Sequence, residues 1–498
     1  MFKRYVHRPP AALLSLFLLA GCVPALPQGA ARHATTTMPA SYQGQLDLES
    51  AALMDWRELF GDEQLSALVE LALENNQELN IAVQENLIAS YEVMARRGEI
   101  YPSLNAGLGG GVERVSSASS QGASDEQAGL DPNLQGYSLG LYASWEVDIW
   151  GRLRNQADAA SYRYLASVQG RHFMITELVA EIARLYYELM ALDQRLEVVS
   201  NTVQIQRSAV DAARLQWQAA RTTSLAVTRF QAELLQFQSR EYELRQQIVE
   251  TENRINFLVG RFPQHVDRAS DHFMDMQPRT LVAGLPTQLL INRPDIRAAE
   301  LQLQAADLDV SATRARYFPA LSLEAGIGYS SFDILRLVET PGSLFFAVFG
   351  NLTAPLLNRT GITADYFSAD ARQRQAVINY ERTILSAYIE VVNRLNLVEN
   401  LAGSYAVRER RVARLSDSID ISTQLFQSAR ADYLEVLTAR RESLDAQLEL
   451  IETKQRQLSA VVSLYQALGG GWRRGDDDDS PADAPADDAE DDAGDEAQ

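Results

Sequence analysis

Histidines, cysteine and closely spaced glycines are the residues of this chain whose types could carry catalysis or hold a cofactor. The histidines are scattered and form no HExxH zinc motif; they are His7, His33, His172, His265 and His272. The segment GLGGGVER from Gly107 has the glycines of a phosphate-binding loop, but no Lys-Ser or Lys-Thr pair follows and no helical pattern opens there. We therefore predict that the chain is not an enzyme and binds no metal or cofactor.

The only cysteine, Cys22, stands at the end of an N-terminal secretion signal. Lys3 and Arg4 give a positive start, and the apolar run AALLSLFLLAGC is too short for a mature transmembrane helix, which needs ~20 residues. The letters LAGC resemble the lipobox of bacterial lipoproteins, whose cysteine becomes the lipid-modified first residue after cleavage. A free cysteine in an ordinary signal is the alternative. We predict a signal peptide over 1–21 and a covalent lipid on Cys22, and, since Val23 rather than Asp follows, an outer-membrane destination.

Charge is spread unevenly along the 498 residues, whose formal net charge is -21. The segment 475–498 has twelve acidic residues and no basic one, so we expect 473–498 to be a disordered, solvated tail. A tail that binds cations or a partner is the functional alternative. The rest of the chain is only mildly acidic, which argues against a nucleic-acid partner. Residues 22–55 are rich in Pro, Ala, Thr and Gln and predict an extended, poorly ordered linker.

Four runs of about ten residues alternate between apolar and polar side chains, as a β-strand with one apolar face does. The runs start at Leu104, Tyr137, Leu321 and Ser343, and the last fits least well. A soluble sheet packed on a core is the ordinary explanation. However, the lengths match a membrane-spanning strand of ~9–11 residues. Aromatic residues also gather at the run ends, at Tyr101, Tyr137, Trp150, Tyr317, Tyr329 and Phe332. We predict membrane strands with Leu141 facing lipid and Ser144 facing water.

Long helical patterns surround these runs. One begins near Asp62 and continues as a single run to Ile100. Another has apolar residues at alternating steps of four and three from Leu178 to Val203, which is a sustained coiled-coil seam. The segment 155–213 has no proline, and as one helix it would extend on the order of 90 Å. These patterns predict long coiled-coil helices rather than a compact domain.

The two halves of the chain repeat one order of elements at an offset near 210 residues. In each half a helical pattern ends at an aromatic residue and a proline, Tyr101-Pro102 and Phe318-Pro319, and two strand patterns and two long helical patterns follow. The proline marks the end of the helix because the residue before it is disfavoured in helical dihedrals. We predict two repeats, over 56–262 and 263–472.

Four strands are too few to close a membrane barrel, whose smallest known count is about eight. An open sheet edge in lipid would leave backbone groups without partners, at several kcal/mol each. Copies of the chain must therefore associate, and the long helices would continue the ring of strands as a second ring. The sequence thus predicts a mainly α-helical protein with membrane β-strands, assembled into a hollow tube.

The sequence resembles the TolC-like outer-membrane efflux factors, and within them the lipid-anchored OprM-like branch. The matching segments are LLINRPDIRAAELQLQAADLDVSATRARYFPALSLEAGIGYSS from Leu289, LYQALGGGW from Leu464 and Trp-Gly-Arg from Trp150. The resemblance covers 56–472. It implies a homotrimer, with a twelve-strand barrel in the outer membrane continued by a periplasmic α-helical barrel. It also implies a passive exit duct for efflux, with multidrug cargo, that docks to a periplasmic membrane-fusion adaptor and a proton-driven inner-membrane pump.

The resemblance further implies that the tube narrows where its long helices reverse direction, with acidic side chains brought into a ring. The matching reversals are 219–223 and 428–433. The family's V-L-D-A pattern reads VLTA here, with Thr438 in place of the Asp, so the implied gate carboxylates are Glu435 and Asp432. A solvated charge at a helix end is the other explanation.

The same reversals are the implied docking tip for the adaptor. The residues concerned are Ala220, Arg221, Thr222, Ala429, Arg430 and Ala431. Alanine stands at positions 220 and 429, where the family has turn glycines, so the sequence leaves the geometry of the tip open.

Other functions also remain open at this stage. A periplasmic coiled-coil scaffold lipoprotein without a pore would have no need for four two-faced strands. The same duct could serve type I protein secretion or metal export; the lipobox favours the drug-efflux branch, and no methionine cluster points to copper or silver. Because cargo is chosen mostly by the pump, the sequence names neither the substrates nor the identity of the pump and adaptor.

Overall fold

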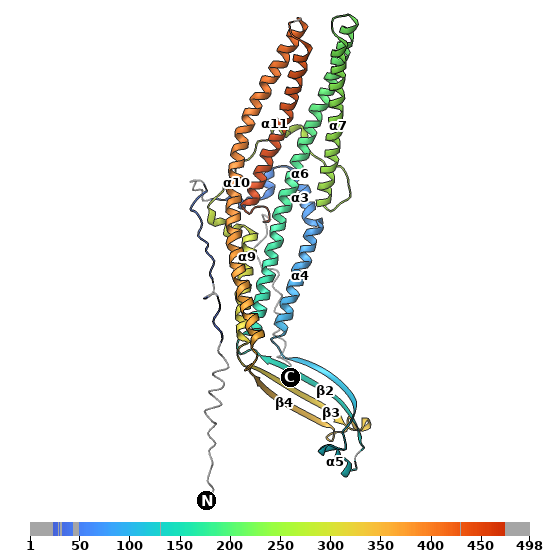
Figure 1. The fold of residues 1–498 in the computed structure, drawn as a ribbon, viewed down its shortest axis with the longest axis vertical. Helices are drawn as coiled ribbons and strands as arrows, with labels where there is room; N and C mark the ends of the chain where they lie inside the picture. The colour runs from blue at the N-terminus through green and yellow to red at the C-terminus, as the bar shows by residue number, and fades with distance from the viewer. Residues whose placement is uncertain are drawn as a thin grey trace, which may run out of the picture. The chain divides into compact units, whose positions relative to one another are not determined.

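The computed structural model describes residues 23–27, 29, 32–42, 49–129, 131–428 and 430–473 (Figure 1). The chain forms two compact units, and each is described by itself. The first draws on the described parts of 1–38, 78–171 and 294–387, and the second on those of 39–77, 172–293 and 388–498. Each unit therefore combines segments of both predicted repeats. Cys22, the predicted signal peptide and the acidic tail from 474 onward lie outside the described residues.

One order of helices and strands occurs twice. The first series is α4 (Gln77–Gly98), β1 (Ser103–Arg114), α5 (Ser120–Gln127), β2 (Asn133–Val147), α6 (Arg152–Gln218) and α7 (Ser224–Leu258). The second is α9 (Pro294–Ala315), β3 (Ala320–Ser331), η4 (Ile334–Arg336), β4 (Leu344–Thr353), α10 (Thr360–Gln427) and α11 (Tyr433–Ala467). Helices α6 and α10 have 67 and 68 residues, and α7 and α11 have 35 each, so the two series match as the duplication predicts.

Shorter elements precede and join the two series. They are η1 (Ala51–Leu53), α2 (Trp56–Phe60), α3 (Glu63–Asn75), η2 (Ser270–Asp275), η3 (Pro286–Gln288) and α8 (Leu289–Asn292). The predicted single helical run from Asp62 is wrong, because it is divided into α3 and α4 at Asn76. Asn76 leaves the helical region with ψ 125, and its side-chain amide donates to the Leu258 carbonyl at 2.8 Å. None of the described helices combines the length and hydropathy needed to cross a membrane.

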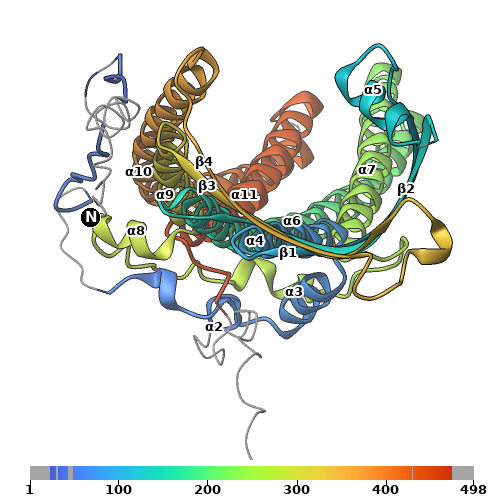
Figure 2. The same cartoon turned by 90° about the horizontal axis from the view of Figure 1, so that it is seen from below.

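The four predicted strands form one antiparallel sheet in the order β1-β2-β3-β4, within the first unit. Residues directly opposite in such a sheet point to the same side. Leu141 lies opposite Ala106 and Ile327, and Ile327 lies opposite Phe346, so the apolar sets of all four strands share one face. Ser144 lies on the other face, opposite Ser103 and Glu324. The sheet is curved (Figure 2), as a segment of barrel wall would be.

Trp150, between β2 and α6, contacts the aromatic-proline junction of the second repeat in the first unit. The indole of Trp150 donates to the Pro319 carbonyl at 2.7 Å and stacks on the Phe318 ring, with 4.8 Å between ring centroids. The Asp148 carboxylate accepts from the backbone N–H groups of Leu153 and Arg154 and caps the start of α6. The turn from strand to long helix is thus fixed by side chains that the sequence places at the run ends.

The coiled-coil seam is confirmed by a buried cluster in the second unit. Its members come from α6, α7 and α11 and are Leu192, Val199, Val203, Phe237, Leu244, Leu444 and Leu448. Leu192 and Val199 on α6 are seven residues apart, as are Phe237 and Leu244 on α7, while Leu444 and Leu448 on α11 are four apart, and both steps occur in heptad packing. In Figure 1 helices α6 and α7 form one antiparallel hairpin, and α10 and α11 form another.

The predicted N-terminal linker is extended but is not free. The Glu381 carboxylate on α10 accepts from the Arg32 guanidinium at 2.5 Å and from the Thr35 backbone N–H at 3.0 Å. The Gln373 amide, two turns earlier on α10, donates to the Arg32 carbonyl at 3.0 Å. These contacts hold the segment that follows Cys22 in sequence against α10.

The reversal between α6 and α7 has the geometry of a Schellman C-cap. The Arg221 N–H donates to the Gln216 carbonyl at 2.8 Å, and the Ala220 N–H donates to the Trp217 carbonyl at 2.9 Å. This motif requires a left-handed residue, and Ala220 supplies it with φ 56. The side chain of Thr223 then caps α7 by accepting from the Ala226 N–H at 3.3 Å. The position expected to hold a family glycine thus keeps the glycine conformation with an alanine in it.

Strand faces can be tested by charge insertion. We expect Leu141→Arg to disfavour membrane insertion by ~2–4 kcal/mol near mid-bilayer, because it places a guanidinium on the apolar face. Ser144→Arg adds the same group to the other face of β2, and we expect it to be tolerated. The measurement is the fraction of folded protein recovered in lipid vesicles across a urea series. Equal recovery for the two variants would refute the assigned faces.

The strain at the first reversal can also be tested. Left-handed backbone costs an alanine about 1–2 kcal/mol, so we expect Ala220→Gly to raise the unfolding temperature of the purified protein. Ala212→Gly is the matched control, because the same atom is removed from an exposed position inside α6, where glycine lowers stability by about 1 kcal/mol. Shifts of the same sign in both variants would contradict a left-handed residue 220.

Candidate functional site

The two predicted gate carboxylates lie together at the start of α11. Asp432 is the N-cap residue and Glu435 lies in the first turn, and both are exposed. Residues three apart on a helix lie on the same face. In the described part of the chain neither carboxylate has a hydrogen bond or ion pair with another side chain. The pair therefore forms a small anionic surface that points away from the helix.

The N-cap positions of the two repeats are used differently. The hydroxyl of Thr223 caps α7 by accepting a backbone hydrogen bond, whereas the Asp432 side chain makes no cap hydrogen bond. Its backbone carbonyl accepts from the Glu435 N–H at 3.1 Å, which keeps the two residues within one turn. The negative charge of the Asp432 carboxylate thus lies near the positive end of the helix dipole, which stabilises it without a cap hydrogen bond.

The opposite side of this turn is packed and fixes its position. Leu437 belongs to a buried cluster with Val210 and Ala213 of α6 and Phe230 of α7. The Tyr433 ring lies 6.3 Å from the Phe230 ring, measured between centroids. Because α11 is held by its apolar side, the carboxylates on its other side have a defined location. Thr438, at the position of the family's Asp, is half-buried.

The predicted docking residues lie in the two reversals. Arg221 and Arg430 are equivalent, since each is the second residue after a helix C-cap: the Arg430 N–H donates to the Leu425 carbonyl at 2.9 Å, as Arg221 does to Gln216. Both arginines are exposed, as is Ala220, while Thr222 and Ala431 are half-buried. Ala429 lies outside the described residues. Each reversal thus presents one arginine to solvent.

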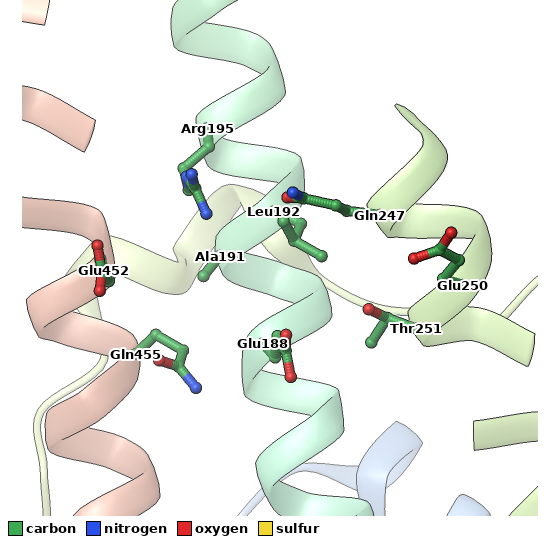
Figure 3. Close-up of a pocket in the computed structure, with 9 residues that line it drawn as sticks. All are labelled: Glu188, Ala191, Leu192, Arg195, Gln247, Glu250, Thr251, Glu452 and Gln455. Carbon is green, nitrogen blue, oxygen red and sulfur yellow. The ribbon is translucent and has the colours of Figure 1, made fainter. Parts of the chain in front are cut away.

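Sequence reasoning missed a polar cavity of about 490 Å³ between α6, α7 and α11. Its lining residues are Glu188, Ala191, Leu192, Arg195, Gln247, Glu250, Thr251, Glu452 and Gln455 (Figure 3). Burial lowers the pKa of the Arg195 guanidinium, while Glu452 and Glu188 act in the opposite direction. The Arg195 Nε has no hydrogen-bond partner in the described chain.

A second cavity, of about 550 Å³, lies between α6, α7, α10 and α11 and includes Arg440. Burial lowers the pKa of Arg440 as well, and its Nη1 has no hydrogen-bond partner among described residues. No sequence signal distinguishes these two arginines from those on a solvated helix face, because the difference lies in what packs across from them. The described residues contain no group of three or more His, Cys, Asp or Glu side chains that could hold a metal ion.

Comparison with known proteins identifies the fold. The sequence model of a family described as outer membrane efflux protein matches residues 68–261 and 285–470. The cation efflux system protein CusC of Escherichia coli is 28% identical over 419 residues, covering 84% of this chain and 88% of CusC. The probable outer membrane lipoprotein SilC of Salmonella typhimurium is 27% identical, covering 93% of this chain and 98% of SilC. The solvent efflux pump outer membrane protein SrpC of Pseudomonas putida is 29% identical, covering 92% and 97%.

A crystal structure of CusC has the same fold. It superposes with a TM-score of 0.78 at 26% identity, and the match covers 89% of this chain and 99% of that one. The resemblance drawn from the sequence motifs is therefore confirmed, as are the outer-membrane localisation and a non-enzymatic role. The chain belongs to the outer membrane efflux protein family and is an outer-membrane efflux channel.

Proposed function

We propose that this chain is the passive exit duct of a tripartite efflux system and works as a homotrimer. The observation that carries the proposal is the open four-stranded sheet with one face that is mainly apolar. Strands β1 and β4 are its edges, and an edge cannot remain unpaired in hydrocarbon. Three copies of four strands give twelve, enough to close a membrane barrel, for which about eight is the minimum.

Exposed apolar side chains on the helices support the same association. Leu235, Tyr242 and Val249 follow one another at seven-residue steps on α7 and are 66%, 70% and 48% exposed. In the first unit, Ile88 and Met94 on α4 are 67% and 64% exposed. An apolar stripe at heptad spacing is the seam of a coiled coil, and patches of this kind mark interaction surfaces. A second copy of the chain would cover them.

The remaining parts of the proposal follow from the ends of the chain and the reversals. Lipidation at Cys22 would anchor the N-terminus in the outer membrane, and the name of SilC, an outer membrane lipoprotein, supports this. The carboxylates of Asp432 and Glu435, repeated in three copies, would form a cation-attracting gate. Arg221 and Arg430, one on each reversal, would meet the periplasmic adaptor of a proton-driven inner-membrane pump.

Cargo is the least constrained part of the proposal. The names of the relatives include both cation efflux and solvent efflux, so one fold serves unlike cargo. We favour organic, multidrug-type cargo over metal export, because aromatic side chains occupy the polar face of the sheet. Protein secretion through the same duct is the alternative, and no observation on this chain favours it.

Trimer formation is tested by charging the α7 stripe. We expect Tyr242→Glu to reduce the trimeric fraction of the purified protein, because an unpaired carboxylate would be buried between copies. Gln236→Glu adds the same charge to another exposed position of α7 and should leave the trimer intact. Native mass spectrometry in detergent gives the fractions. A monomeric wild-type protein, or equal loss in both variants, would contradict the proposed interface.

The gate is tested by single-channel recording in planar bilayers. We expect Asp432→Asn combined with Glu435→Gln to lower the permeability of K⁺ relative to Cl⁻, because fixed anionic charge at a constriction favours cations. Shortening the side chain in Glu435→Ala should raise the conductance. Glu442→Gln, two turns further along α11, removes one carboxylate away from the reversal and is the control. A wild-type trimer without conductance, or an effect of the same size in the control, would count against this gate.

A further inference from the structure

The face of the sheet opposite the apolar one is not uniformly hydrophilic. It carries mostly glycine, serine and asparagine, but three aromatic residues lie on it as well: Tyr142 on β2, and Phe345 and Phe349 on β4. The register establishes this placement, since Tyr142 lies opposite Asn105 and Gly326, and Phe349 lies opposite Glu324. Tyr142 is 39% exposed and Phe349 is 65% exposed. A water-facing surface with several large rings calls for a physical reason.

Glycines on β1, β2 and β3 make room for two of these rings. A Cβ on Gly107 would lie 3.0 Å from Cε2 of Tyr142, and one on Gly326 would lie 3.3 Å from its Cδ1. A Cβ on Gly140 would lie 3.3 Å from Cζ of Phe345. The rings of Tyr142 and Phe345 are 6.3 Å apart between centroids and tilted by 35°. The Tyr142 ring therefore lies over glycines of the two neighbouring strands, β1 and β3, while the Phe345 ring reaches across β3 to Gly140 on β2.

A carboxylate lies beside these rings. Glu324 on β3 is exposed and lies opposite Ser144 and Phe349, with Tyr142 two residues away from Ser144 on β2. In the described part of the chain Glu324 has no hydrogen bond or ion pair. Of the other two acids on this face, Glu146 is paired with Arg152 at 2.7 Å, and Glu113 lies at the far end of β1. The only basic residue in the four strands is Arg114, at the end of β1.

This combination favours one class of ligand. Cations bind to the faces of aromatic rings, and more strongly when little hydration must be removed. A carboxylate with no basic partner attracts cations and repels anions. Small metal ions keep their water shells and gain little from rings, whereas organic cations with apolar groups gain from both the rings and the charge. Anionic cargo would be disfavoured at the same place.

We propose that Glu324, Tyr142 and Phe349 form a binding site for organic cations on the polar face of the sheet. This inference rests on the proposed function, in which that face lines the water-filled barrel. Three copies of the chain would then present three such sites to cargo on its way out. The site binds weakly enough for release, because each part of it is open to solvent.

The test uses tetraphenylphosphonium as a probe that blocks the K⁺ current of the wild-type trimer in a phosphatidylcholine bilayer. We expect half-block to require about fivefold more probe in Glu324→Gln, because the carboxylate is lost, and a similar increase in Phe349→Leu, because a ring is lost without a change of charge. Glu126→Gln removes one carboxylate from α5, off the polar face, and should not change the half-block concentration.

The outcomes are distinguishable. A rise in both Glu324→Gln and Phe349→Leu, without one in the control, supports the site. A conducting wild-type trimer that the probe does not block overturns the inference. So does a shift in Glu324→Gln that Phe349→Leu does not share, because the effect is then one of general charge. A wild-type trimer without conductance overturns the duct itself and this site with it. Phe349 lies on an edge strand and is widely exposed, so its replacement tests the ring without disturbing a packed position.

Discussion

The need to pair backbone hydrogen-bonding groups at a sheet edge is the constraint on which the rest of this protein depends. Hydrocarbon offers no partner for an exposed N–H or C=O, so a four-stranded sheet with edges at β1 and β4 is incomplete by itself. The apolar face formed by all four strands also needs a partner, because no hydrophobic core of the described chain covers it and its exposure to water is unfavourable. In the proposed trimer, the copies that complete the barrel would also pack their helices together, which would account for the exposed apolar residues on α7.

The two series of helices and strands match in order and length but differ at their reversals. The two reversals share one hydrogen-bond pattern and one exposed arginine each, Arg221 and Arg430. They differ at the following N-cap, where Thr223 caps its helix and Asp432 does not. The threonine hydroxyl is used in a hydrogen bond within its own helix. The exposed carboxylate instead adds negative charge to the electrostatic potential at the N-terminus of α11. The proposed gate thus lies at the reversal whose N-cap side chain makes no cap hydrogen bond.

How much the sequence predicts depends on whether a feature is local. Alternation at period two and heptad spacing are local, so the four strands and the seam through Leu192, Val199 and Val203 could be predicted. The break at Asn76 could not, because it depends on the carbonyl of Leu258 far along the chain. Arg195 and Arg440 are hidden for the same reason. In the sequence they look like arginines on the solvent-exposed side of a helix. Only the packing of neighbouring helices shows that both are partly buried and that burial lowers the pKa of each guanidinium.

The glycines of the strands illustrate the same limit and link it to function. From sequence alone they are what a pore-facing surface tolerates, and Gly107 and Gly326 fit that account. The register gives them a second role, because the Tyr142 ring occupies the space that side chains at those positions would fill. A ring that packs on glycine backbone has one face covered by the protein and the other face open to a ligand. A ring in a packed core has both faces covered. Exposure of apolar area to water is costly. The open face of the ring adds nothing to the stability of the sheet, and in the proposed duct a passing organic cation would cover it.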